Sequence, residues 1–430
     1  MKRLGRWTLG TLAVLVAVVL AGCVWITQPA SDADVVATAA QRDAARDYLT
    51  VLAPMPGDAV RETFTPEPGV TLETVTVPAR GTRRGTFVFV PGYTAPIEMY
   101  AEEIGTIADA GWTVATLSQR GQGRSIRQGA AYDMGSVEDF ANLSRDLAAF
   151  VALQEPPVAV VGMSMGAHTA MRMAADWDTD AAAIVAIVPM VEIETGAYPG
   201  WLARGVVEVM VRSGLSERYA PGTGPWDRAA LFLDPERLGE ETICSDLPER
   251  AHMRDALFTL DPDLRVEGPS VGMIAAMLRT QDELRRIGPT IDAPVLMVTA
   301  EQDRMVDNEA AAALCDAMPT CRLIDVPDAP LAKQKRFLAK PHAAAALAVL
   351  RAEAAAGFWD AEAIRELESI EEVAPPPLVT GADLIAAGLT PGPGFSRVLN
   401  AAYDEQLEGR LTTREAALSF AREVQSRVTA

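Results

Sequence analysis

The chain has 430 residues, enough for one large domain with an insertion or for two smaller domains, and 49% of them are apolar. Lys and Arg number 38 against 58 Asp and Glu, so the formal net charge is −20. Nucleic-acid binding needs a basic face that releases counterions, so this balance excludes nucleic acid as an expected partner.

Residues 1–23 are predicted to be a lipoprotein-type signal peptide. Basic residues within the first six positions precede an uncharged stretch from Trp7 to about Ile26, and this order is typical of secretory signals. The segment closes with Leu20-Ala21-Gly22-Cys23, which resembles a bacterial lipobox in which Cys23 becomes the lipidated first residue. The alternative is an uncleaved membrane helix, because the stretch is just long enough to span a bilayer. Both interpretations predict an exported, membrane-anchored protein at a periplasmic or extracellular face, with residues 24–60 as a spacer.

Strands and helices are predicted to alternate over residues 61–189. The segment Thr71–Val77 alternates apolar and polar residues and is predicted to be an edge strand. Alternation of this kind indicates a mostly parallel sheet with helices on both faces. Further strands are expected at 85–90, 112–117, 158–161 and 182–188, and helices at 97–110, at 137–153 and after residue 164.

The alternation stops at about Met190, and residues 190–291 are predicted to be helices and loops with Pro and Gly punctuation. Roughly 100 residues are too many for a connection inside a compact domain, so this segment is predicted to be a cap over the carboxyl end of the sheet. The alternation resumes over residues 292–358. That part carries strands at 294–299 and 321–326 and helices at 308–318 and 342–356, and a linker (359–379) and a small helical module (380–430) follow.

Three cysteines follow the signal segment, Cys244, Cys315 and Cys321. The last two fall at a predicted helix end and at the start of the next strand. In an oxidising compartment either a disulfide or two free buried thiols fits this placement. No spacing resembles a metal site, so we expect neither a metal nor another cofactor.

The most informative motif is Gly162-Met163-Ser164-Met165-Gly166, which reads Gly-x-Ser-x-Gly. It lies between the apolar run Val158–Val161 and the helix-like run Ala167–Met173. A strand, a sharp turn and a helix in this order hold a serine hydroxyl above the sheet edge on a strained turn. The helix start also offers backbone N–H groups to an oxyanion. We therefore predict that Ser164 is a nucleophile, and the alternative is a surface Gly/Ser turn.

A serine needs a base to take its proton and a carboxylate to orient that base. In doubly wound hydrolases the acid follows a later strand than the serine. Asp303 follows the predicted strand 294–299 and is the candidate acid. The alternative is an aspartate at the start of a helix.

These motifs together resemble the α/β-hydrolase superfamily, in particular its branch of lysophospholipases and monoacylglycerol lipases, also called serine-aminopeptidase-like hydrolases. They are the elbow, the Pro91-Gly92-Tyr93-Thr94 loop, the Arg120-Gly121-Gln122-Gly123-Arg124-Ser125 loop and Asp303. The resemblance covers roughly residues 61–358 and extends into the cap at 219–225 and 244–246.

The resemblance implies a doubly wound, mostly parallel α/β sheet with an inserted helical cap. It also implies an oxyanion hole built from the backbone N–H groups of Tyr93 and Met165. An apolar acyl pocket would lie under the cap, although residues at helical spacing can equally form the cap's own core. The candidate pocket residues are Trp201, Leu202, Met210, Met273 and Met277.

The chain has three histidines that could be the base. The family places this residue just after the last strand, where the chain reads Val326–Lys333 and Leu331 occupies the position of the histidine. His168 comes one helical turn after Ser164 and is expected to pack behind the elbow. His252 is expected in the cap, far from the acid.

His342 is the predicted base. It begins the predicted helix 342–356, and an insertion at residues 330–339 would lengthen the preceding loop enough to bring it to Ser164. The alternative is a solvated histidine in the first turn of a helix. In that case the triad is broken and only residual activity is expected.

The module at residues 380–430 carries a second resemblance. Its segments 380–385, 388–393 and 406–409 are similar to the extreme C-terminal motif of bacterial tRNA nucleotidyltransferases. The module has about as many acidic as basic residues, and the signal segment places it outside the cytoplasm. We therefore interpret it as a packing or interaction module and not as an RNA-binding one.

The leading hypothesis is a membrane-tethered serine hydrolase that cleaves acyl esters of the lysophospholipid or monoacylglycerol type. Ser164 would attack, His342 would relay the proton, Asp303 would orient His342, and Tyr93 and Met165 would hold the oxyanion. The alternative is a catalytically decayed α/β-hydrolase lipoprotein that binds a lipid or a partner protein. Small amide substrates are a third hypothesis.

Overall fold

The computed structural model describes residues 27–30, 36–50, 54–194, 200–226, 252–301, 303–326, 370, 374–387, 395–407 and 409–429. The chain forms two compact units, residues 1–299 with 303–324, and residues 300–302 with 325–430. Cys23, Leu331 and His342 lie outside the described residues, as does the predicted helix 342–356. Among the helices that the structure does describe, none is long and apolar enough to cross a membrane.

An eight-stranded, mostly parallel sheet is the centre of the first unit, which confirms the predicted fold class. Its strand order is β1-β2-β4-β3-β5-β6-β7-β8. The first two strands run antiparallel to each other, β2 runs antiparallel to β4, and the pairs from β4 through β7 are parallel. The strands are β1 (Val60–Phe64), β2 (Leu72–Val77), β3 (Gly85–Val90), β4 (Trp112–Leu117), β5 (Val158–Met163), β6 (Ala181–Ile187), β7 (Val295–Ala300) and β8 (Cys321–Val326).

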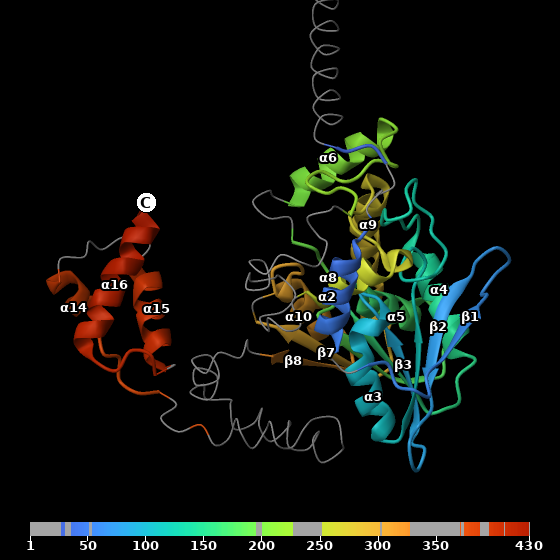
Figure 1. Cartoon of the computed structure of the whole chain (residues 1–430), viewed down its shortest axis with the longest axis horizontal. Helices are drawn as coiled ribbons and strands as arrows, with labels where there is room; N and C mark the ends of the chain where they lie inside the picture. Colours follow the sequence, from blue (N-terminus) through green and yellow to red (C-terminus); the bar gives the residue numbers. More distant parts are fainter. Residues whose placement is uncertain are drawn as a thin grey trace, which may run out of the picture. The chain divides into compact units, whose positions relative to one another are not determined.

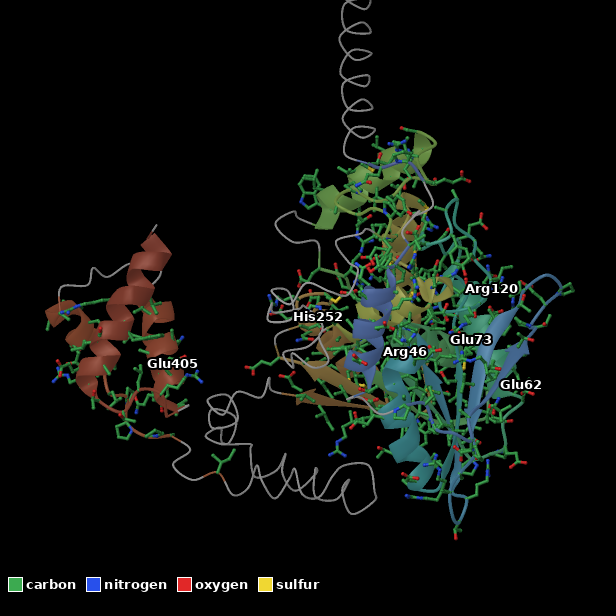
Figure 2. All side chains as sticks on the ribbon, in the orientation of Figure 1. Arg46, Glu62, Glu73, Arg120, His252 and Glu405 are labelled. Atoms are coloured by element: carbon green, nitrogen blue, oxygen red, sulfur yellow. A yellow bond between two sulfur atoms is a disulfide. The ribbon has the colours of Figure 1, made fainter. Side chains whose placement is uncertain are left out.

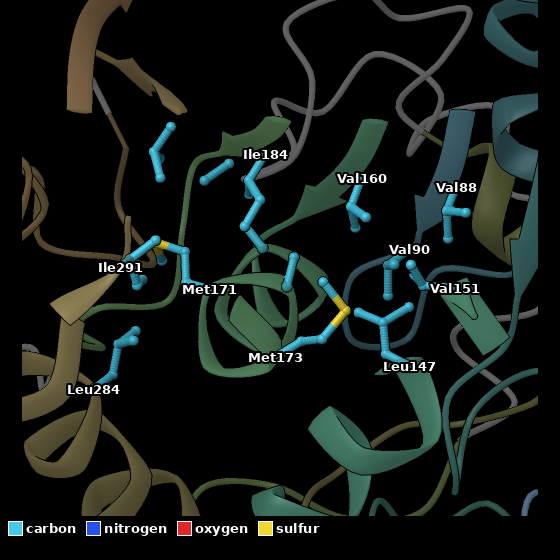
Figure 3. Packing of buried hydrophobic residues seen from close by; sticks show 14 of the residues in the cluster. Val88, Val90, Leu147, Val151, Val160, Met171, Met173, Ile184, Leu284 and Ile291 are labelled. Carbon is cyan, nitrogen blue, oxygen red and sulfur yellow. The ribbon is translucent and has the colours of Figure 1, made fainter. Parts of the chain in front are cut away.

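Helices cover both faces of the sheet. Successive side chains of a strand point to opposite faces, so neighbouring residues of one strand pack against different helices. On β3, Val88 and Val90 pack with α4 (Phe140–Val151) and α5 (Met165–Asp176), as Figure 3 shows. Phe89, between them, packs on the other face with the short 3-10 helix η1 (Ile97–Tyr100) and α3 (Ala101–Asp109). Helix α10 (Asn308–Ala317) adds Leu314 and Cys315 to the first of these cores.

Most predicted bounds lie within a few residues of the observed ones, and two differences have a clear physical cause. Strand β2 is not an edge strand, because β1 pairs with it on its outer side. Strand β1 escaped prediction because four of its five residues are exposed, so its sequence has no apolar face to detect. The helix predicted at 137–153 begins only at Phe140, because the Asp139 side chain caps it by accepting from the Ala141 N–H at 2.9 Å.

The connection between β6 and β7, residues 190–291, is called the cap segment below. Its described elements are α6 (Gly200–Arg212), α8 (Met253–Leu260), η4 (Pro262–Leu264), α9 (Val271–Ile287) and η5 (Gly288–Thr290). Figure 1 shows α6 and α9 close together, and Met210 of α6 packs with Val271 of α9. Helix α8 packs against α2 (Ala39–Leu49), a helix within the predicted spacer.

A disulfide joins Cys315, near the end of α10, to Cys321, the first residue of β8. The structure thus decides between the two arrangements that the sequence left open. Cys244 lies outside the described residues.

Within the described part of the second unit, the helices are α14 (Gly381–Ala386), α15 (Phe395–Leu407) and α16 (Arg414–Thr429). The Thr380 and Asp383 side chains form a capping box at the start of α14. The three helices share a small apolar core, which gives this module packing of its own. The buried members of the core are Val379, Leu384, Val398, Ala402, Ala417 and Ala421.

Candidate active site

Ser164 occupies a sharp turn between β5 and α5. Its φ is 50° and its ψ is −110°, a region in which residues with a side chain are strained. The Ser164 N–H donates to the Ile187 carbonyl at 2.8 Å, and the Ser164 carbonyl accepts from the His168 N–H at 3.0 Å. The neighbouring strand and helix therefore hold the turn in its strained conformation.

Close backbone contacts explain the glycines around the turn. A Cβ atom on Gly166 would overlap the carbonyl oxygens of Val90 and Pro91, so α5 can approach the end of β3 only with glycine there. A Cβ atom on Gly92 would lie 3.5 Å from the Ser164 Cβ. The loop after β3 therefore lies directly against the serine. This strand–turn–helix geometry is the elbow that the sequence predicted.

Two backbone N–H groups near the serine are available to an oxyanion. Met165 is the first residue of α5, so its N–H has no carbonyl one turn earlier to bind. The N–H of Tyr93 follows Gly92 in the loop that contacts Ser164. Among the described residues, neither N–H donates to a protein acceptor.

The loop that carries Tyr93 is fixed on both sides. The Tyr93 hydroxyl donates to the Glu267 carbonyl of the cap segment at 2.5 Å. Burial raises the pKa of this phenol well above its ordinary value, so it stays a neutral donor. The next residue, Thr94, has a φ of 58°, and its N–H donates to the Gln122 side-chain carbonyl at 2.8 Å.

Side chains in and beside the loop 120–125 support the loop that carries Tyr93, and the sequence predicted no roles for them. Gln119, just before the loop, donates to the Pro91 carbonyl at 3.1 Å and accepts from the Thr169 hydroxyl at 2.6 Å. Arg120 forms a two-bond ion pair with the buried Asp146, at 2.5 and 2.8 Å. Figure 2 labels Arg120 beside α4. The glycine-rich motif was a visible signal, but only contacts distant in sequence reveal what each side chain does.

A second ion-pair group fixes the other end of this loop. The buried Glu73 of β2, labelled in Figure 2, accepts from the Ser118 hydroxyl at 2.8 Å and pairs with Arg124 at 2.9 Å. Arg124 also pairs with Glu98 at 2.8 Å and with Asp261 of the cap segment. The loop therefore links the sheet to the cap segment.

His168 packs behind the elbow, as predicted, and is fully buried. Its Nδ1 lies 2.9 Å from the Met190 carbonyl, and its Nε2 lies 2.8 Å from the Thr280 hydroxyl. An Nδ1–H that donates to the carbonyl leaves Nε2 to accept from Thr280. Burial lowers the pKa of His168 to about 3. Both ring nitrogens are therefore occupied, and His168 is unsuited to act as the base.

His252 is the N-cap residue of α8 and has contacts with that helix and with α2. Its backbone N–H donates to the Tyr48 hydroxyl at 3.3 Å, and its Nδ1 lies 3.8 Å from the Asp255 carboxylate. These contacts belong to the packing of α2 on α8 and not to the elbow. His342, the predicted base, is outside the described residues.

Asp303 lies in the loop that follows β7. Its Oδ1 accepts from the N–H groups of Met305 at 2.7 Å and Val306 at 2.9 Å. Both bonds use one carboxylate oxygen, and no described residue donates to Oδ2. The residue that caps α10 is Asp307, which accepts from the Glu309 and Ala310 N–H groups. Asp303 is therefore not the helix-capping aspartate of the alternative interpretation.

An apolar cluster, called the elbow cluster below, contains residues of α5, of α9 and of the loop that carries Tyr93. Met273 and Met277 of α9 pack in it with Met165, and Tyr93 and Val306 contact the same cluster. Two of the five candidate pocket residues thus lie beside the elbow.

The other three candidates are placed elsewhere. Met210 is buried within the cap segment, packed with Val271. Trp201 and Leu202 are 75% and 38% exposed. The acyl pocket that the family resemblance implies made them candidates, and their sequence alone does not say which face of the helix turns inward.

The sheet, the elbow and the covering helices define an α/β-hydrolase. The chain matches the family Serine aminopeptidase, S33, over residues 81–329, which is more than half its length, and it belongs to that family.

Curated relatives include Lysophospholipase L2 of Escherichia coli (strain K12), which is 25% identical over 235 residues. That alignment covers 53% of this chain and 66% of the relative, just under two thirds of the relative's length. The Monoacylglycerol lipase of Mycolicibacterium smegmatis is 25% identical over 235 residues, covering 54% of this chain and 75% of the relative.

Among solved structures, a soluble variant of monoglyceride lipase from Saccharomyces cerevisiae in complex with a substrate analog has a TM-score of 0.47 at 15% identity. The match covers 64% of this chain and 88% of that chain.

Proposed function

We propose that this protein is a serine hydrolase, tethered to a membrane, that cleaves acyl esters of the lysophospholipid or monoacylglycerol type. The observation that carries the proposal is Ser164 on its strained turn, with the loop of Tyr93 packed against it. The similarity to a lysophospholipase and to a monoacylglycerol lipase supports the substrate class.

The proposed reaction uses the elbow in two steps. The Ser164 Oγ attacks the ester carbonyl carbon while the base takes its proton, and the Tyr93 and Met165 N–H groups bind the resulting oxyanion. The carbonyl re-forms, the C–O bond to the alcohol breaks, and the base returns its proton to the alcohol. Water then attacks the acyl-serine in the same way, which releases the fatty acid and restores Ser164.

The proposed base is His342, oriented by Asp303. Two observations support it indirectly. His168 has both ring nitrogens occupied, and the contacts of His252 lie on α2 and α8. The Oδ2 of Asp303, to which no described residue donates, suits a carboxylate that must accept from an imidazole N–H.

The proposed tether is the N-terminal segment, with Cys23 lipidated and the body of the chain on the periplasmic or extracellular side. The basic start and the apolar stretch up to Ile26 support this. The Cys315–Cys321 disulfide also fits an oxidising compartment.

A second candidate function is a non-catalytic lipid- or partner-binding lipoprotein. Leu331, in the position where the family has its histidine, favours it. In that case the elbow would persist without a working base.

Covalent labelling separates the two candidates. The full chain in detergent would be treated with a fluorophosphonate probe, with Ser164→Ala as the test variant and Ser213→Ala as the control. Ser213 is an exposed serine after α6 whose hydroxyl donates to the Val209 carbonyl. The hydrolase proposal predicts labelling of the parent and of the Ser213 variant and none of the Ser164 variant. A folded parent that takes up no probe would favour the binding protein.

A further inference from the structure

Helix α6 carries exposed apolar side chains along one side. Trp201 and Val209 are eight residues apart, about two helical turns, with Gly205 midway between them. Trp201 is 75% exposed and Val209 is 40% exposed, and Leu202 adjoins Trp201. These four residues are called the α6 stripe. The opposite side of the helix is packed, and its members are Val206, Val207, Met210 and Val211.

The N-terminal residues 27–30 contact the folded unit next to this helix. The Arg218 guanidinium donates to the Thr27 carbonyl at 2.6 Å and to its hydroxyl at 2.7 Å. The Tyr219 N–H donates to the Gln28 carbonyl at 3.0 Å. Arg218 and Tyr219 follow α6 closely, and Figure 1 shows the dark blue segment of residues 27–30 running beside that helix.

This attachment limits how far the proposed anchor can lie from α6. Cys23 precedes Thr27 by four residues, and four extended residues span at most roughly 14 Å. Thr27 itself is buried, so the tether has little slack before it meets the fold. A bilayer that holds the anchor must therefore pass close to the α6 end of the cap segment.

We propose that the α6 stripe rests in the headgroup region of the bilayer that holds the N-terminal anchor, so that the cap segment faces the membrane. The proposal rests on the tether described under the proposed function. Tryptophan prefers this interface, where its ring is apolar and its N–H stays hydrated. An amphipathic helix with an exposed apolar side lies in the same plane.

Charges on α6 do not oppose this placement. Arg204 pairs with Asp282 at 2.8 Å, and Glu208 pairs with Arg212 at 2.7 Å. The net charge of −20 provides no overall attraction to anionic lipids. Apolar contact is therefore the main attraction, and the tether supplies the high local concentration that so small a surface needs.

The placement also connects the membrane to the elbow. Helix α9 packs against α6 through Val271 and Met210, and its Met273 and Met277 belong to the elbow cluster. One helix therefore contacts both the membrane-facing helix and the residues beside Ser164. An acyl chain that leaves the bilayer would meet the cap segment first.

Fluorescence quenching by lipid tests the proposal without substrate. The full chain would be reconstituted in phosphatidylcholine vesicles whose acyl chains carry bromine, a contact quencher of tryptophan. Trp201→Phe is the test variant. Trp177→Phe is the matched control, because Trp177 is 40% exposed at the end of α5. We expect the Trp201 variant to lose part of the bromine-quenched emission, and the Trp177 variant to lose only emission that bromine leaves unquenched.

The possible outcomes separate the proposed membrane surface from the tether and from the catalytic activity. A vesicle-bound chain whose quenched emission is unchanged by Trp201→Phe would overturn the proposed surface and leave the tether standing. A full chain that fails to float with vesicles would overturn both. A chain that shows the Trp201 signal but hydrolyses no ester would keep the surface and contradict only the proposed catalytic activity.

Discussion

At the scale of residues, the strained Ser164 depends on neighbours that carry no chemistry themselves. Its φ of 50° is held by hydrogen bonds to Ile187 and His168. The Gln122 side-chain carbonyl similarly supports Thr94, at a φ of 58°, by accepting from the Thr94 N–H. Strain of this kind persists only where the surrounding structure over-determines it. Substitution of the residues that hold these strained turns should therefore disturb the site as much as substitution of Ser164 itself.

The ion pair of Arg120 with Asp146 is one such support. Both side chains are nearly inaccessible, at 5% and 2% exposure, so removing one leaves a buried charge without its partner. We expect Arg120→Ala to lower the free energy of unfolding by about 3–5 kcal/mol, measured by urea denaturation. The control is Arg80→Ala, whose pairs with Asp58 and Asp109 are exposed, and it should change stability little. Equal losses in the two variants would contradict this account.

The low pKa of His168 predicts how the stability of the fold depends on pH. Its pKa is about 3 in the folded chain because burial disfavours the charged ring, and an imidazole in the unfolded chain titrates near about 6.5. The unfolded state therefore binds more protons between these values. Stability that is complete above about pH 6.5 is lost as the pH falls toward 3, by roughly 1.4 kcal/mol per unit.

The variant His168→Gln lacks this titration. Its free energy of unfolding should fall less steeply than that of the parent as the pH is lowered from about 6.5 to about 4. Urea unfolding of both proteins at several pH values measures the two slopes. If the free energy of unfolding fell equally steeply with pH in both proteins, His168 would bind its proton as readily in the folded chain as in the unfolded one.

At the scale of elements, the close approach of α5 to β3 depends on glycine at position 166. A Cβ atom there would overlap the Val90 and Pro91 carbonyl oxygens. We expect Gly166→Ala to lower the free energy of unfolding by about 2–3 kcal/mol. The control is Gly205→Ala on α6, where a Cβ atom meets open space and should stabilise the helix by roughly 0.5–1 kcal/mol. Denaturation midpoints that shift in the same direction in both variants would refute the argument.

Elements with a clear pattern of apolar residues could be predicted from the sequence. Strands such as Gly85–Val90 and Trp112–Leu117 matched their predicted bounds, because buried strands are short apolar runs between turn residues. Strand β1 could not be predicted, because Val60–Phe64 is mostly exposed and is fixed by pairing with β2. The elbow was readable because its local sequence dictates a turn.

The pocket residues were less predictable for a similar reason. Trp201 and Met273 both lie on helices of the cap segment, yet one is exposed and the other is buried near Met165. Helical spacing says which residues share a face, and only the packing between helices decides which face turns inward. Gln119 and Gln122 escaped assignment because their partners are distant in sequence.

At the scale of the whole molecule, the C-terminal module has its own core, while the family match ends at residue 329. We expect Leu384→Ala, which truncates a fully buried side chain, to destabilise the module by about 3 kcal/mol. Amide hydrogen exchange should rise in α15 and α16. Hydrolysis of p-nitrophenyl esters should stay at the parental rate, and a parallel loss of hydrolysis would show that the module supports the catalytic unit.

The proposed function requires that Ser164 and His342 form a catalytic unit. The most direct measurement is p-nitrophenyl ester hydrolysis by the full chain in detergent, with Ser164→Ala, His342→Ala and the control His252→Ala, each checked for folding by circular dichroism. We predict that the first two variants lose activity by at least roughly a thousandfold and that the control keeps it. Activity that survives His342→Ala would place the base elsewhere, and a folded parent without activity would contradict the claim as a whole.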